Sequence, residues 1–284
     1  MNKVIELYGK STTDASVDWV SIVKTQKCPF TVRRCVKSRK SQPEKTIGVC
    51  TVLHGSGSSQ TPAIICPHRL LECRRIFMDC IHLLALHKPG NDFHIIPEFS
   101  VPGGSVDYCL VSAQGDKVVD FVGIELQTLD TTGSTWPARQ QFLQQMGACA
   151  PTLKAVKGTA LGINWKMTAK TILVQIHHKV HTFEAVGKHL AVVVQDCLSD
   201  YFSREFQFEH VHRLPLMEDA VHFHAYSMGT MDKAGYTLRL ATRYSTDSIG
   251  IATCLGLQSD AKMELGDILT RLSSKLSKRT LFTF

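Results

Sequence analysis

The chain has 284 residues, of which 44% are hydrophobic and 20% are charged, so it has enough apolar residues for one large core or a core with a small additional module. Lys and Arg exceed Asp and Glu by seven (32 against 25), which suits a polyanionic partner but is also common in proteins that bind none. The N-terminus lacks the layout of a signal peptide and no apolar run reaches about eighteen residues, so we expect a cytoplasmic protein without a membrane span.

Helices and strands are predicted to alternate over most of the chain. Residues 1–25 are expected to form a helix ending near Lys24, and apolar residues three or four apart predict an amphipathic helix from Arg69 to Lys88. Three β-prone runs at 93–99, 106–112 and 117–126, separated by glycine-containing turns, predict a meander of strands. The later predicted elements are a helix at 136–149, strands at 170–177, 190–195, 221–227 and 236–244, a helix from near Thr182, and helices at 246–257 and 263–276.

Four of the ten cysteines fall within residues 26–68, a segment rich in Gly, Ser, Pro, Lys and Arg that has little apolar periodicity. They are Cys28, Cys35, Cys50 and Cys66. Four thiolates could bind an iron or zinc ion that organises this segment, although the tight two-residue spacing of zinc ribbons is missing and four unrelated reduced cysteines are the alternative. We divide the chain into an N-terminal region, residues 1–70, which carries this module at 26–68, and an α/β core, residues 71–284.

Acidic residues lie on or beside the three strands of the predicted meander. In a strand ending at Gln127, the side chains of Glu125 and Gln127 project from one face, and neighbouring strands could bring Asp107 and Glu98 to the same place. Carboxylates this close repel one another unless a divalent cation neutralises them, and hard oxygen ligands favour magnesium. Such a cation suits phosphodiester hydrolysis.

An acid followed by an acid-x-lysine on a strand is the layout of the PD-(D/E)xK nucleases. Here Gln127 stands at the lysine position, and it can orient a water molecule but carries no positive charge. An Asp followed by Glu-x-Gln also arises by chance in many proteins, so the spacing alone leaves that alternative open.

Several cationic and amide side chains are candidates for DNA contacts, with an ordinary solvated surface as the alternative for each. Four come from the cysteine segment, where a metal-braced loop could grip phosphates, and two come from the helix after the acidic block, where they could read bases. Two more lie at i and i+4 on a predicted strand and are expected to share a face. The candidates are Arg33, Arg34, Lys37, Arg39, Arg139, Gln140, Arg239 and Arg243.

Three blocks of sequence together resemble the NotI family of restriction endonucleases, over most of the chain. The first reads Cys28-Pro29-Phe30, Cys35, Gly48-Val49-Cys50 and Ile65-Cys66-Pro67-His68-Arg69-Leu70. The second reads Glu98, Gly104, Val106-Asp107-Tyr108, Phe121-Val122-Gly123-Ile124-Glu125-Leu126-Gln127 and Thr128-Leu129-Asp130-Thr131-Thr132-Gly133. The third reads Gly162-Ile163-Asn164-Trp165-Lys166 and Thr171-Ile172-Leu173-Val174-Gln175-Ile176-His177-His178-Lys179.

The resemblance implies a restriction-endonuclease-like fold, with a central mixed sheet flanked by helices. It implies that Asp107 and Glu125 bind magnesium, that Gln127 positions the attacking water, as the family has glutamine at this position, and that Glu98 completes the acidic pocket. It further implies iron at the four cysteines, with zinc as the alternative.

By the same resemblance, the expected activity is that of a type II restriction endonuclease. It would act as a homodimer and cut both strands of double-stranded DNA at a specific, palindromic and GC-rich site, while a companion DNA methyltransferase protects the host. Two other functions stay open at this stage. One is a metal-stabilised DNA-binding protein without cleavage activity, and the other is a nuclease of the same fold that recognises DNA structure rather than sequence.

Overall fold

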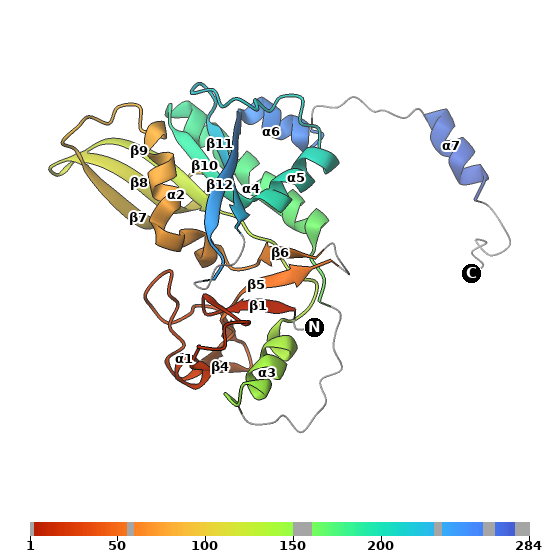
Figure 1. Cartoon of the computed structure of the whole chain (residues 1–284). Coiled ribbons are helices and arrows are strands. Elements are labelled where there is room, and N and C mark those ends of the chain that lie inside the picture. Colours follow the sequence, from red (N-terminus) through yellow and green to blue (C-terminus); the bar gives the residue numbers. More distant parts are fainter. Residues whose placement is uncertain (1–2, 56–59, 150–160, 230–234, 258–264, 276–284) are drawn as a thin grey trace.

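A six-stranded mixed sheet forms the centre of the fold (Figure 1). The computed structural model describes residues 3–55, 60–149, 161–229, 235–257 and 265–275. The strand order is β12-β11-β10-β9-β8-β7, in which β9, β10 and β11 are parallel and the other neighbouring pairs are antiparallel. The strands are β7 (Asp92–Val101), β8 (Gly104–Gln114), β9 (Lys117–Leu126), β10 (His189–Gln195), β11 (Val221–Met228) and β12 (Leu238–Thr246).

Helices cover both faces of this sheet, because its central strands are apolar on both sides. On β10, Val192 belongs to one buried cluster together with α4, α5 and α6, and the next residue, Val193, belongs to the other cluster together with η2, α2 and η3. The covering elements are α4 (Trp165–Ala185), α5 (Asp196–Glu205), α6 (Ser248–Cys254), η2 (Pro67–Arg74), α2 (Arg75–Cys80) and η3 (Ile81–Leu83). The predicted α/β fold with a central mixed sheet flanked by helices is confirmed.

A smaller antiparallel sheet, of order β2-β1-β5-β6, lies beside the large one (Figure 1). Helices α1 and α3 pack together on it, with the rings of Trp19 and Phe142 edge to face at 4.9 Å. Residues of both sheets occur in the same buried cluster. The elements of this part are β1 (Val4–Leu7), β2 (Lys10–Ser11), α1 (Trp19–Thr25), β3 (Ser38–Arg39), β4 (Gln42–Thr46), β5 (Val49–His54), β6 (Thr61–Ile64) and α3 (Trp136–Gln145).

The strands predicted at 93–99, 106–112, 117–126, 190–195, 221–227 and 236–244 are confirmed with small shifts of their ends, as are helices within 136–149, 246–257 and 263–276, the last being α7 (Leu265–Ser273). In the part of the chain that the structure describes, every helix is too short or too polar to cross a lipid bilayer. The division into residues 1–70 and 71–284 stays a prediction.

The helix predicted over residues 1–25 is wrong for all but its end. Residues 4–7 are a fully buried strand, and Tyr8 and Gly9 both have positive φ angles, of 50° and 69°. They form the two-residue turn of the hairpin in which Leu7 pairs with Lys10. The helix α1 begins only at Trp19, where the side chain of Asp18 accepts a hydrogen bond from the Ser21 amide and caps it.

The strand predicted at 170–177 is also wrong, because these residues lie within the long helix α4. Its β-branched residues favour a strand locally. The buried positions Ile172, Ile176, Val180 and Phe183 nevertheless recur every three or four residues, and packing of that stripe against the sheet decides the structure.

The helix predicted from Arg69 to Lys88 is broken into η2, α2 and η3. The chain leaves helical geometry at Glu72 (ψ 124°), and Cys73 and Arg74 have positive φ angles. The break lets the Glu72 carboxylate accept a hydrogen bond from the Leu238 amide at 2.6 Å, while Arg75 donates to the Leu238 carbonyl. Hydrogen bonds to Leu238, at the start of β12, are therefore made in place of a continuous helix.

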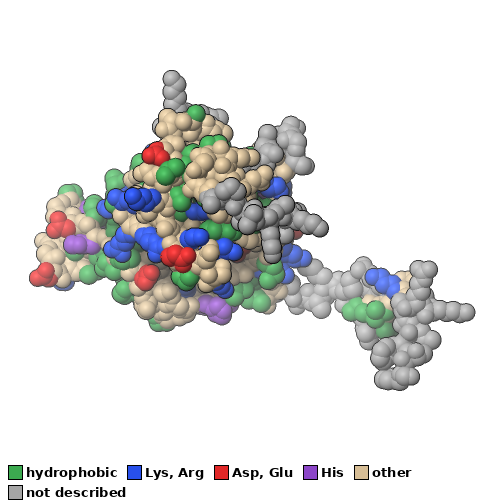
Figure 2. Space-filling view, turned by 90° about the horizontal axis from the view of Figure 1, so that it is seen from below, with side chains coloured by type: hydrophobic (Ala, Val, Ile, Leu, Met, Phe, Trp, Pro, Cys, Tyr) green, Lys and Arg blue, Asp and Glu red, His purple; other side chains and the backbone are tan. Residues whose placement is uncertain are grey.

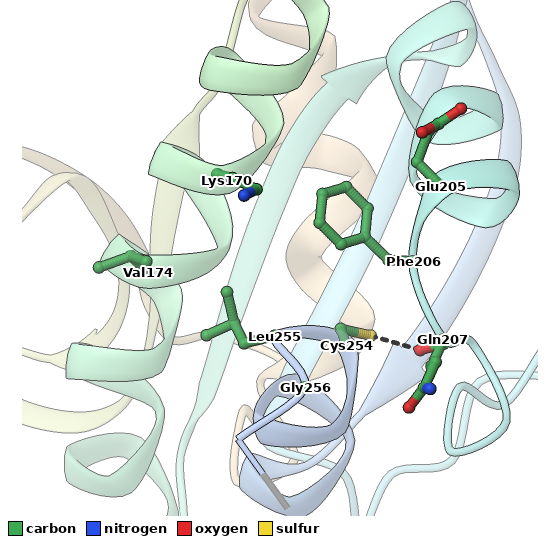
Figure 3. A pocket seen from close by; sticks show the side chains of 8 residues that line it. All are labelled: Lys170, Val174, Glu205, Phe206, Gln207, Cys254, Leu255 and Gly256. Carbon is green, nitrogen blue, oxygen red and sulfur yellow. Dashed lines mark hydrogen bonds between the residues drawn. The ribbon is translucent and has the colours of Figure 1, made fainter. Parts of the chain in front are cut away.

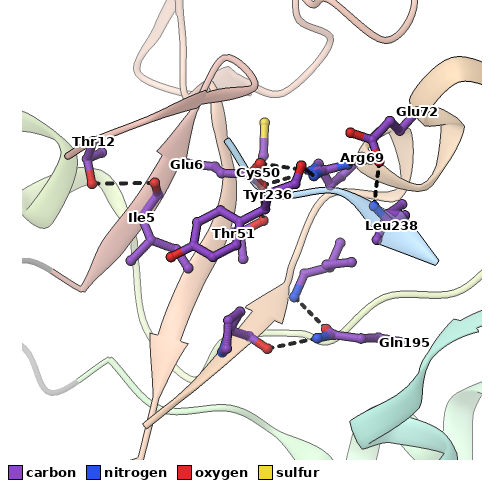
Figure 4. A network of polar contacts seen from close by, with 12 residues as sticks. Ile5, Glu6, Thr12, Cys50, Thr51, Arg69, Glu72, Gln195, Tyr236 and Leu238 are labelled. Carbon is purple, nitrogen blue, oxygen red and sulfur yellow. Dashed lines mark hydrogen bonds and ion pairs between the residues drawn. The ribbon is translucent and has the colours of Figure 1, made fainter. Parts of the chain in front are cut away.

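A buried ion pair joins η2 to the small sheet (Figure 4). Arg69 is 1% exposed, and its Nε donates to both carboxylate oxygens of Glu6 on β1, at 3.0 and 2.8 Å. Its Nη2 donates to the carbonyl of Tyr236, just before β12, at 2.7 Å. Burial alone would lower the pKa of Arg69, but the charge of Glu6 raises it. A single guanidinium thus holds together three segments that are far apart in sequence.

The side chain of Gln195, at the end of β10, makes a second connection between the sheets (Figure 4). Its Nε2 donates to the Pro62 carbonyl at 2.8 Å, and its Oε1 accepts from the Ile64 amide at 2.8 Å. Strand β6 is therefore attached to the large sheet through both polar atoms of one side-chain amide.

Replacing Arg69 with methionine is expected to lower the free energy of unfolding by about 3–5 kcal/mol, because it leaves the Glu6 carboxylate buried without its cation. Denaturant unfolding measures the change. The double variant Glu6→Gln with Arg69→Met should recover part of the loss, and Arg74→Met, at an exposed position of the same element, should change stability by less than about 0.5 kcal/mol. A loss below about 1 kcal/mol in Arg69→Met would contradict this view of the pair.

Candidate functional site

Three acidic side chains lie in one row across β7, β8 and β9. Tyr108 on β8 pairs with Pro97 on β7 and with Ile124 on β9. Continued by one residue, this register aligns Asp107 with Glu98 on one side and with Glu125 on the other. Asp107 interacts electrostatically with both carboxylates. The structure therefore brings together the three carboxylates that the sequence predicts to lie close.

Asp107 and Glu125 are held by backbone and side-chain hydrogen bonds. The Leu126 amide donates to Oδ2 of Asp107 at 2.7 Å, and Nε2 of Gln127 donates to Oε2 of Glu125 at 3.3 Å. Burial raises the pKa of Glu125 to about 7, and burial also raises the pKa of Asp107, against the hydrogen bond from Leu126 and the charge of Lys179. Both carboxylates are thus in surroundings where a compensating cation stabilises their ionised forms.

Helix α4 contributes two further polar side chains to this row. The ammonium of Lys179 donates to Oε1 of Glu125 and to the carbonyl of Ser105. The Gln175 side chain accepts from Nε2 of Gln127 at 3.5 Å. Each oxygen of Glu125 is therefore bonded, one to Lys179 and the other to Gln127.

Glu98 has a positive φ angle of 52°, unusual for a residue within a strand. A left-handed conformation costs a non-glycine residue about 1–2 kcal/mol. The paired positions on either side of it, Pro97 with Tyr108 and Phe99 with Val106, keep the register. Glu98 acts electrostatically on Asp107, so its carboxylate lies near the row. Strain of this kind concentrates at functional sites.

The four cysteines of the N-terminal module approach one another from separate segments. Three are buried, Cys35 is half-buried, and all four thiols are free. Burial and then the neighbouring Cys66 thiol raise the pKa of Cys50 well above its usual value, and burial raises the pKa of Cys66, to which Cys35 and Cys28 also contribute. These interactions place the thiols near one another, while the four-cysteine module itself stays a prediction.

The two sets of donors suit the metals that the sequence predicts. Free thiols suit iron or zinc, and carboxylates suit magnesium. As placed in the described parts of the chain, however, no three His, Cys, Asp or Glu side chains form a group that could hold a metal ion. Metal binding by the thiols and by the acidic row stays a prediction.

His68 lies between the cysteine module and the acidic row. Burial opposes ionisation of Cys28, but hydrogen bonds, first among them the one with the His68 side chain, lower the pKa of this thiol to about 7. His68 also acts electrostatically on Asp107, and Arg33 acts on Tyr108, the residue after Asp107. The module therefore borders the acidic row directly.

The cations of the module differ in their exposure and in the contacts that they make within the protein. Arg33 and Arg34 are exposed, and Arg34 bonds to the Glu44 carbonyl. Lys37 is half-buried and donates to the Ile65 carbonyl, and Arg39 is half-buried with its guanidinium 4.8 Å from the ring centre of Trp136. Figure 2 looks at the molecule from the side of the small sheet and shows Lys and Arg side chains gathered on that face, with a few acidic ones among them.

Arg139, which the sequence suggested as a base-reading residue, is buried in the protein. It is 4% exposed, donates from Nε to the Ile47 carbonyl at 2.8 Å and from Nη2 to the Tyr8 hydroxyl at 3.2 Å, and lies over the ring of Trp136. Its neighbour Gln140 is half-buried and accepts from the same guanidinium. In this conformation Arg139 attaches α3 to the small sheet.

The expectation that Arg239 and Arg243 share a face of their strand is wrong. Arg239 lies opposite Ser227 and Arg243 opposite His224, which are three residues apart on β11 and so point to opposite faces. A bulge in β12 causes the change of face. Arg243 bonds to the Asp79 carbonyl at 3.2 Å, whereas Arg239 is exposed. The strand order also places β12 and the acidic strands β7 and β8 at opposite ends of the sheet.

Lys179, Gln175 and His68 were not predicted as site residues, although all three occur in the blocks that resemble the NotI family. Gln175 was missed because residues 170–177 were predicted as a strand, and Lys179 because it falls between that strand and the helix predicted from near Thr182. The apolar stripe of Ile172, Ile176, Val180 and Phe183, at helical spacing, is the signal that could have placed both residues on one helix. His68 was missed because nothing in the chain order indicates that the cysteine module meets β8.

A separate cavity of about 300 Å³ lies between α4, α6 and the segment after α5 (Figure 3). The Cys254 thiol donates to the Gln207 carbonyl at 3.0 Å at its edge. None of the predicted site residues lines it. The lining residues are Lys170, Val174, Glu205, Phe206, Gln207, Cys254, Leu255 and Gly256.

A mixed sheet flanked by helices, with carboxylates aligned on adjacent strands and an acid-x-glutamine at the end of the last one, fits the class of site-specific nucleases. A family model described as restriction endonuclease NotI matches residues 22–238, and the chain belongs to this family of restriction endonucleases. The protein is therefore a nuclease and a hydrolase, and its substrate is DNA. None of the curated proteins compared with the chain matches it.

Because Arg139 is bonded within the protein, Arg139→Met is expected to lower stability without changing the slope of log affinity for DNA against log salt concentration. Arg33→Gln, which removes an exposed cation beside the acidic row, should instead reduce that slope by about 1 per bound chain and leave stability nearly unchanged. Fluorescence anisotropy over a salt series and thermal unfolding measure both effects. A reduced slope in Arg139→Met with unchanged stability would place this residue at the DNA after all.

Proposed function

We propose that the protein is a type II restriction endonuclease that hydrolyses a phosphodiester bond in each strand of double-stranded DNA, at a specific palindromic and GC-rich site, with magnesium as its cofactor. The observation that carries the proposal is the row of Glu98, Asp107 and Glu125 beside Gln127, in a chain of the NotI family. The enzyme would act in the cytoplasm, with a companion DNA methyltransferase protecting the host's own sites.

Asp107 and Glu125 are the ligands in this proposal, and Glu98 completes the acidic pocket. A carboxylate has about four lone-pair sites, so the bonds that Asp107 and Glu125 already accept leave others for a cation. Magnesium, when bound, supplies a Lewis acid that stabilises negative charge on the phosphate and acidifies water.

Gln127 positions the attacking water. Its amide NH₂ group points toward Glu125 and Gln175. These two bonds orient the amide so that its carbonyl oxygen can accept a hydrogen bond from a water molecule beside the carboxylates. Glutamine can orient the water but cannot supply the positive charge that a lysine would bring.

The cysteine module is proposed to hold one iron ion, with zinc as the alternative. Its exposed cations would contact DNA phosphates, and the proximity of Arg33 to Tyr108, the residue after Asp107, would bring the phosphate backbone to the acidic row. A metal at the thiols would thus fix the part of the DNA-binding surface that borders the reacting groups.

The proposal is tested by digesting large GC-rich genomic DNA with magnesium and sequencing the fragment ends. Ends that share one palindromic sequence support a type II restriction endonuclease. Binding without cleavage would identify a DNA-binding protein, and ends without a common sequence would identify a nuclease that recognises DNA structure. Either of these results overturns the proposal.

Asp107→Asn is expected to reduce cleavage at least about 1,000-fold, because it removes a charged magnesium ligand while its amide oxygen can still accept from the Leu126 amide. DNA affinity measured in EDTA should stay within about threefold of the unchanged protein, since the phosphate contacts are elsewhere. Asp116→Asn, in the exposed turn between β8 and β9, is the matched control and should cut normally. Strong cutting by Asp107→Asn would remove the acidic row from the mechanism.

Elemental analysis of the purified protein is expected to find about one iron or zinc ion per chain. Iron would give a coloured oxidised protein and zinc a colourless one. Cys66→Ser should lose the metal and lower the thermal midpoint, because a thiolate ligand is removed from a segment with little core of its own. Cys73→Ser, an exposed cysteine outside the module, should do neither. A metal-free protein of normal stability would mean that the four thiols are unrelated.

The enzyme is expected to bind its site as a homodimer, since one active site hydrolyses one strand and a two-fold axis in the protein would match that of a palindrome. Analytical ultracentrifugation of the complex with a short duplex carrying the site should give two chains per duplex. An inactive Asp107→Asn chain mixed with active chains should yield duplexes nicked in one strand. One chain per duplex, cutting both strands, would exclude the homodimer.

A further inference from the structure

Lys179 is a buried lysine, 7% exposed, and comes from a helix rather than from the sheet that carries the acids. Its ammonium donates to Oε1 of Glu125 and to the Ser105 carbonyl, and it acts electrostatically on Asp107. Burying a lysine is costly unless it is paired and hydrogen-bonded, as this one is. The proposed mechanism above gives it no part.

The turn between β7 and β8 is shaped to admit this lysine. Gly103 has φ +90°, and a Cβ atom there would lie 2.1 Å from the carbonyl oxygen of His178. Gly104 has φ +138°, and a Cβ atom there would lie 3.1 Å from Cε of Lys179. Thr182, on the next turn of α4, donates to the Pro102 carbonyl at 2.9 Å. Two glycines in conformations that L side chains rarely adopt thus let α4 come close enough for Lys179 to reach Glu125.

We propose that Lys179 supplies, from helix α4, the positive charge that the lysine of an acid-x-lysine motif supplies from the strand, and that Gln127 retains only the hydrogen-bonding part of that role. Lys179 is a positioning residue: it holds one oxygen of Glu125 while Gln127 holds the other, which fixes the carboxylate in one orientation toward the metal and the scissile phosphate. This inference rests on the proposed magnesium-dependent cleavage.

The alternative is that Lys179 only neutralises a buried carboxylate for the sake of folding. The two roles differ in what happens after the protein has folded and bound DNA. A purely structural cation affects stability alone, whereas a positioning cation affects the rate of cleavage in the bound complex. The two can be separated because the same ammonium group can be moved to position 127, where an acid-x-lysine motif would carry it.

The experiment compares Lys179→Met, which has nearly the same length without the charge, with the double variant Gln127→Lys and Lys179→Met, which returns the charge from the strand. Lys170→Met, at an exposed position on the same helix, is the control. Single-turnover cleavage with saturating enzyme and magnesium gives the rate, anisotropy in EDTA gives DNA affinity, and thermal unfolding gives stability.

Lys179→Met is expected to cut about 100-fold more slowly while its DNA affinity stays within about threefold, as found when one preorganised electrostatic group is removed from an active site. The double variant should recover at least tenfold in rate, that is, roughly half of the loss on a logarithmic scale. Lys170→Met should match the unchanged protein. A folded Lys179→Met that cuts within about threefold of the unchanged protein, or a folded double variant no faster than Lys179→Met, overturns the proposal.

If Lys179→Met does not fold, the double variant decides the question, because it keeps one ammonium beside Glu125. Cleavage by the folded double variant within about 30-fold of the unchanged protein supports the proposal, and its absence overturns it. Failure of the proposed function is distinguishable from failure of this inference. In the first case the unchanged protein shows no magnesium-dependent cleavage, and in the second it cuts, Asp107→Asn does not, and Lys179→Met does.

Discussion

The buried ion pair between Arg69 and Glu6 is the constraint on which the arrangement of the molecule depends. Arg69 follows Cys66, Pro67 and His68 directly, so the same short segment supplies a thiol to the cysteine module, an imidazole to the border of the acidic row, and a guanidinium to the contact between the two sheets. A buried guanidinium tolerates little displacement, because its partners are unsatisfied when it moves. Its position therefore fixes where the module meets β8.

The acidic row in turn depends on side chains that come from outside its own strands. Three carboxylates on adjacent antiparallel strands repel one another, and the fold places Lys179 and His68 beside them from two different directions. One arrives on α4 and the other on the cysteine segment. The two sheets and the long helix are thus connected by electrostatic interactions at the place where DNA hydrolysis is proposed, in addition to the shared apolar core.

The parts of the fold that could be predicted from sequence are those in which local pattern and tertiary packing agree. The strands through Asp107 and Glu125 are β-prone runs bounded by glycine-containing turns, so their pairing as a meander and the proximity of the acids could be predicted. Helix α4 could not be found in this way, since its β-branched residues favour a strand until a sheet is present for its apolar stripe to cover. Lys179 was missed for that reason. Arg139 was predicted to lie at the surface because no sequence pattern indicates that Ile47 and Tyr8, from the distant N-terminal part of the chain, accept hydrogen bonds from its guanidinium.

The row formed by Glu98, Asp107 and Glu125 also limits how this sequence can change over evolutionary time. Side chains alternate between faces along a strand, so inserting or deleting one residue in β8 would carry Asp107 to the opposite side of the sheet while Glu98 and Glu125 stayed in place. Surface connections remote from the row tolerate changes in length at small thermodynamic cost. Relatives that retain the activity should therefore differ freely in the length of those connections, whereas insertions or deletions of a single residue inside β8 should be absent.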